Sequence, residues 1–326
     1  SGEFVQSFSV GGNVDGGKLW HHASMIPQDD DITASRPPFE RVEAGPVFLP
    51  HSHEPRIVAM GLAPMDGPWV DCVSEDHWRE HKLAARAQLG RRVYAVLPEA
   101  VEAAEEFAEL VMDFAVPQAY SSRGVVPQSS DFGEQASTTQ SPRSESLWRA
   151  SLEVADDLVV MMPGKQGQYR LMTASLCSPS DWRLEEKIGA TMTEVHGPIP
   201  RLNDEIGGQI DRFFARLPTD RFIQRFNWSL TPRADLMSRD HWQVDPAADA
   251  LWYRAERQSL RRLPKTGAVA FTIRVHICPL ASLKAHGDAL DLLWEAIEAA
   301  PEDLRHYKGL DVLAPVIANW RDKNRL

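Results

Sequence analysis

The residue best placed to carry chemistry is His196, which stands near the end of segment 177–200, CSPSDWRLEEKIGATMTEVHGPIP. Gly197 and Pro198 follow it directly, and this pair should end a helix. A histidine at a helix C-terminus can bond the last carbonyls and stabilise the helix dipole, and this capping role is the simpler interpretation of the residues alone. The same placement suits a metal ligand, because a carbonyl can hold the Nδ1 proton and leave Nε2 for the metal ion.

Two further groups of polar residues could bind charged ligands. Segment 256–267, ERQSLRRLPKTG, holds four cations within nine residues, namely Arg257, Arg261, Arg262 and Lys265. Most such clusters are solvated surface, but guanidinium groups also pair with carboxylates through two hydrogen bonds. Arg225 and Asn227 alternate with Phe226 and Trp228, so on a strand the two polar side chains share one face.

Two other patterns suggest alternative metal sites. The run from His77 to His81 matches the H-x-x-E-H pattern of zinc metalloproteases, in which both histidines would bind zinc and Glu80 would act as general base. An ordinary solvated helix explains these residues equally well, and no third ligand is obvious. Cys177 is a possible thiolate ligand, since a helix N-terminus would lower its pKa, although a buried structural thiol accounts for it more simply.

Nucleotide-binding and iron–sulfur motifs do not accompany these groups. No G-x-G-x-x-G precedes a predicted helix, so neither a flavin nor a nicotinamide site is indicated. The three cysteines, Cys72, Cys177 and Cys278, are far apart and form no cluster pattern. Electrons for a redox reaction would therefore come from another protein.

One capped amphipathic helix is predicted to deliver His196. Ser178 can act as N-cap, Pro179 suits the first helical position, and Asp181 sits three residues after the cap. Apolar residues then recur at helical spacing at Leu184, Ile188, Met192 and Val195. A second helix is predicted to end at Pro218, and its apolar face comprises Ile206, Ile210, Phe213, Phe214 and Leu217.

Five strands are predicted before and after these helices. Their segments are 157–162, 168–174, 221–230, 250–260 and 267–277. The first two flank Gly-Lys-Gln-Gly and indicate a hairpin, and the last alternates apolar residues with other types. The order strand–strand–helices–strand–strand–strand is that of a PAS-type sheet, an α+β fold with helices on one face.

The chain is predicted to contain a flexible arm over residues 1–36 and a single domain over residues 37–326. Within the domain, segment 117–146 is rich in Ser, Gln, Thr and Pro, and we interpret it as a lid or a disordered insertion. Segment 281–323 is predicted to form a helical cap. Further helices are predicted near 75–90 and after Pro98.

The composition limits the classes of molecule that the protein is expected to bind. The 326 residues are 43% hydrophobic, enough for a sizeable core, and the net charge of -11 argues against nucleic acid or an anionic membrane as a partner. No apolar run approaches the ~18 residues of a membrane span. Three scattered cysteines suit a reducing compartment, so a cytoplasmic location is expected.

Four sequence blocks resemble the haem-dependent oxidative N-demethylase alpha-subunit family. In chain order they are SPSDWRLEEKIG, VHGPIP, RFNW and ERQSLRRLPKTGAVAFTIR. The likeness starts near residue 60 and continues to the C-terminal helices. It implies a PAS-like domain that binds haem b, oxidises a small amine with O2, releases formaldehyde and takes electrons from a separate flavin and iron–sulfur reductase.

The resemblance also implies roles for single residues. It makes His196 the axial iron ligand, and it places the haem propionates on Arg257 and Arg261. The other family positions are pocket candidates, namely Arg183, Lys187, Arg225, Asn227 and Glu256. The sequence departs from the family pattern in the 117–146 insertion and at Val275-His276, so a specialised biosynthetic haem oxygenase is one alternative. A PAS-like haem sensor and a zinc hydrolase at His77, Glu80 and His81 are the others.

Overall fold

The computed structural model describes residues 43–54, 56, 61–65, 67–72, 76–122, 142–197, 202–239 and 243–324. All of them belong to the unit that comprises residues 37–326. The predicted arm over residues 1–36 lies outside the described residues, and so does most of the predicted 117–146 insertion.

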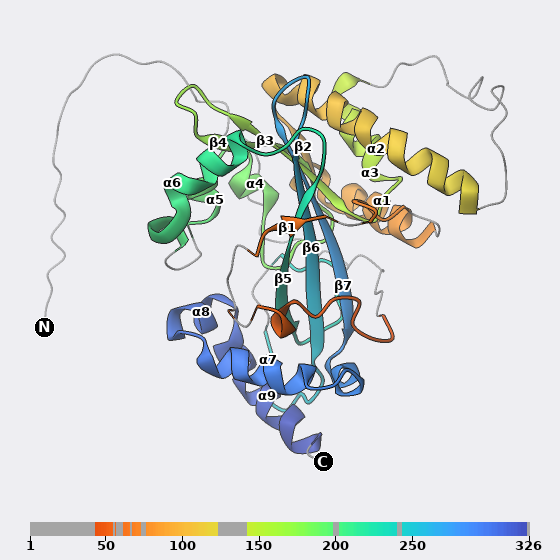
Figure 1. The fold of residues 1–326 in the computed structure, drawn as a ribbon. Helices are drawn as coiled ribbons and strands as arrows, with labels where there is room; N and C mark the ends of the chain where they lie inside the picture. The colour runs from red at the N-terminus through yellow and green to blue at the C-terminus, as the bar shows by residue number, and fades with distance from the viewer. Residues whose placement is uncertain are drawn as a thin grey trace, which may run out of the picture. The chain divides into compact units, whose positions relative to one another are not determined.

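Seven strands of the described residues form one antiparallel sheet in the order β1-β5-β6-β7-β3-β4-β2 (Figure 1). Their bounds are β1 Ala63–Pro64, β2 Tyr94–Val96, β3 Asp157–Pro163, β4 Tyr169–Ser175, β5 Ile223–Thr231, β6 Trp252–Arg262 and β7 Val269–Pro279. The hairpin β3–β4 and the strands β5, β6 and β7 fall on the five predicted segments, where apolar residues recur with a period of two. β6 pairs along its whole length with β7, and β5 pairs along its whole length with β6.

Helices precede, interrupt and follow these strands in the chain. Their bounds in the described residues are α1 Asp76–Leu89, α2 Val101–Ser122, α3 Ser146–Ser151, α4 Leu184–Lys187, α5 Met192–Val195, α6 Leu202–Ala215, α7 Ala289–Ala299, α8 Glu302–Tyr307 and α9 Leu310–Lys323. Short 3-10 turns are η1 Pro50–Ser52, η2 Gly90–Arg92, η3 Pro98–Ala100, η4 Arg143–Glu145 and η5 Leu280–Ala285. The predicted α+β class is confirmed, and none of these helices is long and apolar enough to cross a membrane.

Helices pack against both faces of the sheet, not against one face as predicted. Successive residues of β3 point to opposite faces. Leu158 and Val160 share a buried cluster with Phe107 of α2 and Leu147 of α3. Val159, with Met161, packs instead in the cluster that contains the buried residues of α4, α5 and α6. We call this second side the α4–α6 face, and it is the face that carries His196.

The predicted single helix over 178–197 is wrong, because the segment forms two short helices, α4 and α5. Between them, the Gly189 N–H donates to the Leu171 carbonyl at 2.7 Å, and the Leu171 N–H donates to the Ala190 carbonyl at 3.0 Å. These bonds to β4 replace the bonds that a continuous helix would make. Gly189 also has a φ of +81°, which glycine adopts without strain.

The predicted loop over 117–146 is shorter than expected at both ends. The helix α2 continues through Ser122, past a proline at which sequence rules favour an end. On the other side, η4 and α3 occupy residues 143–151. Only residues 123–141 lie between these elements, and they are outside the described part of the chain.

The C-terminal helices reach the sheet at β5 and β6. Leu293 of α7 and Leu313 of α9 are fully buried in one cluster with Trp228 and Tyr253. The short helix α8 lies between α7 and α9 in the chain. Lys308, which follows α8 directly, donates from Nζ to the Trp228 carbonyl at 2.9 Å, so this helical segment is anchored to the edge of β5.

Candidate functional site

His196 lies at the C-terminal end of α5, as predicted. Thr191 and Glu194 form a capping box that starts this helix, and the His196 N–H donates to the Met192 carbonyl at 3.0 Å. Nδ1 of the half-buried imidazole makes no hydrogen bond of ordinary geometry, although an interaction with the Met192 backbone, in the preceding turn, raises the pKa of the ring slightly. Burial lowers the pKa of His196 to about 4, and repulsion from Arg225 adds to this effect. The ring is therefore neutral at pH 7.

The predicted pocket residues Arg225, Asn227 and Glu256 share one face of the sheet. Asn227 of β5 pairs with Glu256 of β6, and Arg225 pairs with Gln258. Side chains of directly paired residues point to the same face. Asn227 Nδ2 donates to Glu256 Oε2 at 3.3 Å, and Gln258 Nε2 donates to the same oxygen at 3.2 Å. The charge of Arg225 acts on His196, so this is the α4–α6 face.

Glu256 is ionised although its side chain is only 16% exposed. Burial raises its pKa, but the nearby Arg254 charge, the Asn227 hydrogen bond and the Lys308 charge outweigh burial and hold the pKa below its ordinary value. Arg254 Nε lies 3.3 Å from Glu256 Oε1. Two of its other nitrogens donate to the carbonyls of Leu236 and Ser178, which orients the guanidinium and, through it, the carboxylate.

Lys308 and Tyr307 belong to the same polar cluster, and the sequence did not reveal them. Lys308 Nζ donates to Asn227 Oδ1 at 2.8 Å. Burial lowers the pKa of Lys308 to about 8, Glu256 offsets part of this effect, and Arg225 adds to it. Burial and repulsion from Glu256 raise the pKa of Tyr307 to about 12. In the sequence, a lysine before Gly309 is typical of an ordinary helix end, so nothing marked Lys308 as part of a site.

Arg183 and Lys187 lie on the same side, at the two ends of α4. The charge of Lys187 contributes to the lowered pKa of His196, so this lysine lies near the imidazole. Arg183 is exposed, forms an ion pair with Glu186 at 3.7 Å and donates from Nε to the Arg239 carbonyl at 3.3 Å. Of the two, Lys187 is the residue whose charge acts on His196.

Arg257 and Arg261 are not brought together with His196. They alternate with Glu256 and Leu260 on β6, so they point to the opposite face of the sheet. Arg257 Nη2 lies 3.0 Å from an oxygen of Asp71 and 3.6 Å from an oxygen of the fully buried Asp156. Arg261 Nε donates to the Thr219 carbonyl at 2.8 Å, and its guanidinium lies over the Phe222 ring. Structural contacts thus occupy both arginines.

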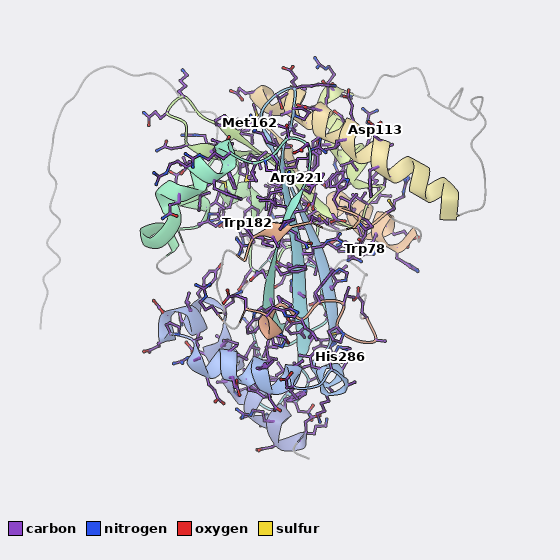
Figure 2. The ribbon with its side chains drawn as sticks, in the orientation of Figure 1. Trp78, Asp113, Met162, Trp182, Arg221 and His286 are labelled. Atoms are coloured by element: carbon purple, nitrogen blue, oxygen red, sulfur yellow. The ribbon has the colours of Figure 1, made fainter. Side chains whose placement is uncertain are left out.

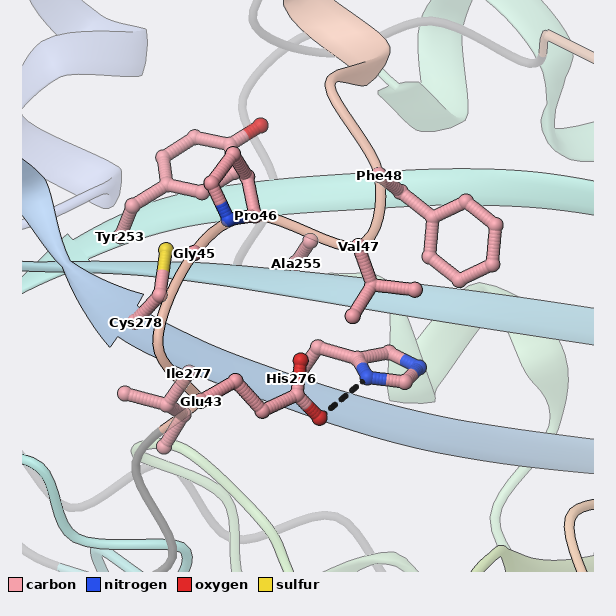
Figure 3. Close-up of a pocket in the computed structure, with 10 residues that line it drawn as sticks. All are labelled: Glu43, Gly45, Pro46, Val47, Phe48, Tyr253, Ala255, His276, Ile277 and Cys278. Atoms are coloured by element: carbon pink, nitrogen blue, oxygen red, sulfur yellow. Dashed lines mark hydrogen bonds and ion pairs between the residues drawn. The ribbon is translucent and has the colours of Figure 1, made fainter. Parts of the chain in front are cut away.

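His276 lies on this opposite face, with its ring held by a carboxylate (Figure 3). Its Nδ1 is 2.7 Å from Glu43 Oε1, and its Nε2 is buried without a hydrogen-bond partner. The neighbouring pocket, bounded by Phe48 and Ala255, has about 140 Å³ of empty space that is partly open to solvent. It leaves no room for a water molecule, so it is not a cofactor pocket as it stands. Arg274 of the same face bonds Asp71 at 2.7 Å, and its guanidinium lies over the Trp78 ring. Trp78 belongs to α1 and is labelled in Figure 2.

The zinc alternative finds no support in the described residues. His81 is buried, and its Nε2 is 2.7 Å from the Cys177 carbonyl oxygen, whereas His77 and Glu80 are exposed on α1. Across the described ranges, no group of three or more His, Cys, Asp or Glu side chains is placed to hold a metal ion. Cys177 is fully buried, and burial raises the pKa of its thiol to about 12, so the thiol is protonated in this structure.

The chain matches the model of a known protein family. The family model of the haem-dependent oxidative N-demethylase, alpha subunit-like proteins matches residues 71–318, which is most of the chain. The chain belongs to this family. The resemblance of the four sequence blocks is thereby confirmed, and the N-demethylase-like family is by its description one of haem-dependent oxidative enzymes. The matched range includes His196, Glu256 and Lys308, and it excludes Glu43.

Proposed function

We propose that this chain is a haem-dependent oxygenase in which His196 binds the iron of haem b and a small or specialised amine is oxidatively N-demethylated. The observation that carries the proposal is the state of His196. Its imidazole is half-buried at a helix end, and its pKa of about 4 keeps it neutral at pH 7. Neutral imidazole is the form that binds iron.

The groups around His196 fit a haem. Arg225 and Lys187 act electrostatically on the imidazole, so cations lie near it, as the propionates of a haem require. The chain order β3, β4, helices, β5, β6, β7 supports a PAS-like sheet, with His196 carried by the helices that connect the two halves. The family description supports haem as the cofactor.

The chain's own residues would bind and orient the substrate. Haem b, when bound, supplies the iron chemistry that activates O2. Glu256 is ionised and is held by Arg254 and Asn227, so it can accept a hydrogen bond from the N–H of a protonated amine. Orientation of the N-methyl group in this way is the contribution that a protein makes to such a reaction.

Electrons would come from a separate protein, a flavin and iron–sulfur reductase. In the proposed reaction, an N-methyl amine, one O2, two electrons and two protons give the demethylated amine, formaldehyde and one water. The C–N bond to the methyl carbon breaks, and the methyl carbon is oxidised. The O2 supplies one oxygen atom to formaldehyde and the other to water.

Formaldehyde release tests this function. Protein reconstituted with hemin is reduced by a surrogate flavin or ferredoxin reductase and exposed to O2 with dimethylamine or with N-methylated amino acids. We expect formaldehyde from at least one amine. Glu256→Gln keeps the shape of the side chain but removes its charge, so it should retain the haem spectrum and lose most of the product.

Two results would contradict the proposal. If no amine yields formaldehyde and none shifts the haem spectrum, the chain is not a demethylase, and a haem sensor or another oxygenation becomes the better assignment. Equal product from Glu256→Gln and the parent would remove Glu256 from the substrate site. Gln209→Glu, at an exposed position in the middle of α6, is a charge-changing control that should leave product formation unchanged.

A further inference from the structure

Two cations of the polar cluster beside His196, Arg225 and Lys308, interact electrostatically with the carboxylate of Glu256. Arg254 interacts with Glu256 as well, but the charge of Asp157 also acts on this arginine. Burial disfavours the charged form of Arg225 and of Lys308, and Glu256 offsets only part of this effect for each. One more negative charge in this cluster would therefore be stabilised by both cations.

Lys308 has a donor available for such a group. Its ammonium carries three N–H bonds, and two of them are directed at neutral oxygens, Asn227 Oδ1 at 2.8 Å and the Trp228 carbonyl at 2.9 Å. These two bonds also hold Nζ on the face of Asn227 and Glu256. Lys308 thus presents a positioned cation to the candidate site, and among the described residues no carboxylate is hydrogen-bonded to it.

We propose that Lys308, together with Arg225, forms a carboxylate-binding subsite on the α4–α6 face of the sheet. This inference rests on the proposed function and concerns the same site. The carboxylate comes either from a haem propionate or from the substrate. In the second case the substrate is an N-methylated amino acid, whose ammonium group faces Glu256 while its carboxylate faces Lys308.

The geometry favours Lys308 and Arg225 over Arg257 for this role. Arg257 is on the other face of the sheet and already bonds Asp71. Simple dimethylammonium, a cation without a carboxylate, would add positive charge beside Arg225 and Lys308. An amino acid adds no net charge and compensates Lys308 directly.

Binding of hemin and of its dimethyl ester shows whether Lys308 binds a haem propionate or has only a structural role. Apo-protein is titrated with each porphyrin at the Soret band, in the parent, Lys308→Met and Lys308→Arg. If a propionate binds Lys308, Lys308→Met should weaken hemin binding about tenfold or more, as expected for a lost charge-assisted hydrogen bond. The ester, which lacks the charge, should bind parent and Lys308→Met equally, and Lys308→Arg should restore hemin binding. The control Lys323→Met removes a lysine that is 63% exposed and paired with Asp249, and it should behave as the parent.

A comparison of N,N-dimethylglycine with dimethylamine shows whether the carboxylate that binds Lys308 comes from the substrate. Each is added to the ferric haem-bound protein, and the dissociation constant is read from the shift of the Soret band. If the substrate carboxylate binds Lys308, the parent should bind N,N-dimethylglycine more tightly than dimethylamine. Lys308→Met should weaken N,N-dimethylglycine binding about tenfold or more, should not weaken dimethylamine binding, and should bind hemin as the parent does.

Three outcomes would overturn the subsite. The first is no change in Lys308→Met for either porphyrin or either amine. The second is an equal loss of hemin and its ester, because that pattern reports a structural defect. The third concerns a parent protein that gives no Soret band, a result that refutes the haem function itself. Calorimetric titration of that protein with N,N-dimethylglycine then decides the subsite: binding that Lys308→Met loses supports it, and no binding by the parent refutes it.

Discussion

At the scale of single residues, burial lowers the pKa of two histidines by a similar amount. Burial lowers the pKa values of His81 and His196 to about 4, well below the ordinary value of 6.5. His81 is 1% exposed and bonds the Cys177 carbonyl, so its neutral state serves the fold. His196 is only half-buried at the end of α5, so its neutral ring is the one that a ligand could reach.

Acid should weaken the fold as pH falls from about 6.5 to 4, because the unfolded chain then binds a proton that folded His81 does not. Above pH ~6.5 this contribution is complete, and it is lost as pH falls through the pKa of the folded state. Between pH 7 and pH 5, His81 alone should remove about 2 kcal/mol from the free energy of unfolding. Guanidinium titrations at both pH values measure the loss.

His81→Gln should lose about 2 kcal/mol less than the parent over this interval, since glutamine does not titrate. His306→Gln is the matched control, because the His306 side chain is 83% exposed, and its loss should equal that of the parent. Equal pH dependence in His81→Gln and the parent would show that His81 is not kept neutral by burial.

Arg257→Met should destabilise the fold and leave haem affinity unchanged. It removes the cation shared by Asp71 and the fully buried Asp156, and breaking a buried ion pair costs roughly 3–5 kcal/mol. Arg321→Met breaks an exposed pair with Glu298 and should cost less than about 1 kcal/mol. A tenfold loss of hemin affinity with unchanged stability would instead place Arg257 at the propionates.

Local alternation in the sequence explains which site residues could be predicted to lie together. Alternation along a strand correctly placed Arg225 and Asn227 together, because the period of two is local. The same rule places Glu256 and Arg257 on opposite faces, although the family resemblance implies a role at the site for both. Lys308 could not be predicted, since its bond to Asn227 depends on packing between segments about 80 residues apart.

At the scale of elements, the link between α4 and α5 decides where His196 lies. The segment that follows α4 bonds to β4 through Gly189 and Ala190, and α5 then starts at the Thr191 capping box. Helical spacing of Leu184, Ile188 and Met192 suggested one continuous helix. The prediction failed because backbone hydrogen bonds to β4 replace helical hydrogen bonds at this link. Hydrophobic periodicity carries no information about such long-range hydrogen bonds.

Gly189→Ala should displace α5 as well as cost stability. Its φ of +81° disfavours any residue with a Cβ by roughly 1–2 kcal/mol. Gly167→Ala is a matched control, because Gly167 has the same φ but lies in the β3–β4 turn with open space around its Cβ position. Both variants should lower the free energy of unfolding by a similar amount, measured by denaturant titration.

Only Gly189→Ala should also change the Soret band of the haem-bound protein, since only this variant strains the segment that leads to His196. An unaltered Soret band in a Gly189→Ala protein that shows the expected loss of stability would mean that this link does not position the iron ligand. An altered band in Gly167→Ala would mean that general destabilisation, not the position of α5, perturbs the haem.

At the scale of the whole described unit, the sheet carries polar clusters on both faces. One contains His196, Arg225, Glu256 and Lys308, and the other contains Asp71, Arg257, Arg274 and His276. The α+β class and the positions in the chain of β3, β4, β5, β6 and β7 could be predicted, because they follow from local periodicity, whereas the short strands β1 and β2 were not predicted. The division of polar residues between faces required the register of β5, β6 and β7, and the packing of helices on both sides could not be derived from segment order alone.

The central claim is that His196 binds the iron, and the ferric spectrum of hemin-reconstituted protein tests it most directly. His276 provides the sharpest control, because its Nε2 is also buried without a partner while its ring is held by Glu43 on the opposite face. His196→Ala should abolish or strongly shift the Soret band, and His276→Ala should leave it as in the parent. The reverse result, an intact band in His196→Ala and its loss in His276→Ala, would contradict the account and place the haem on the other face of the sheet.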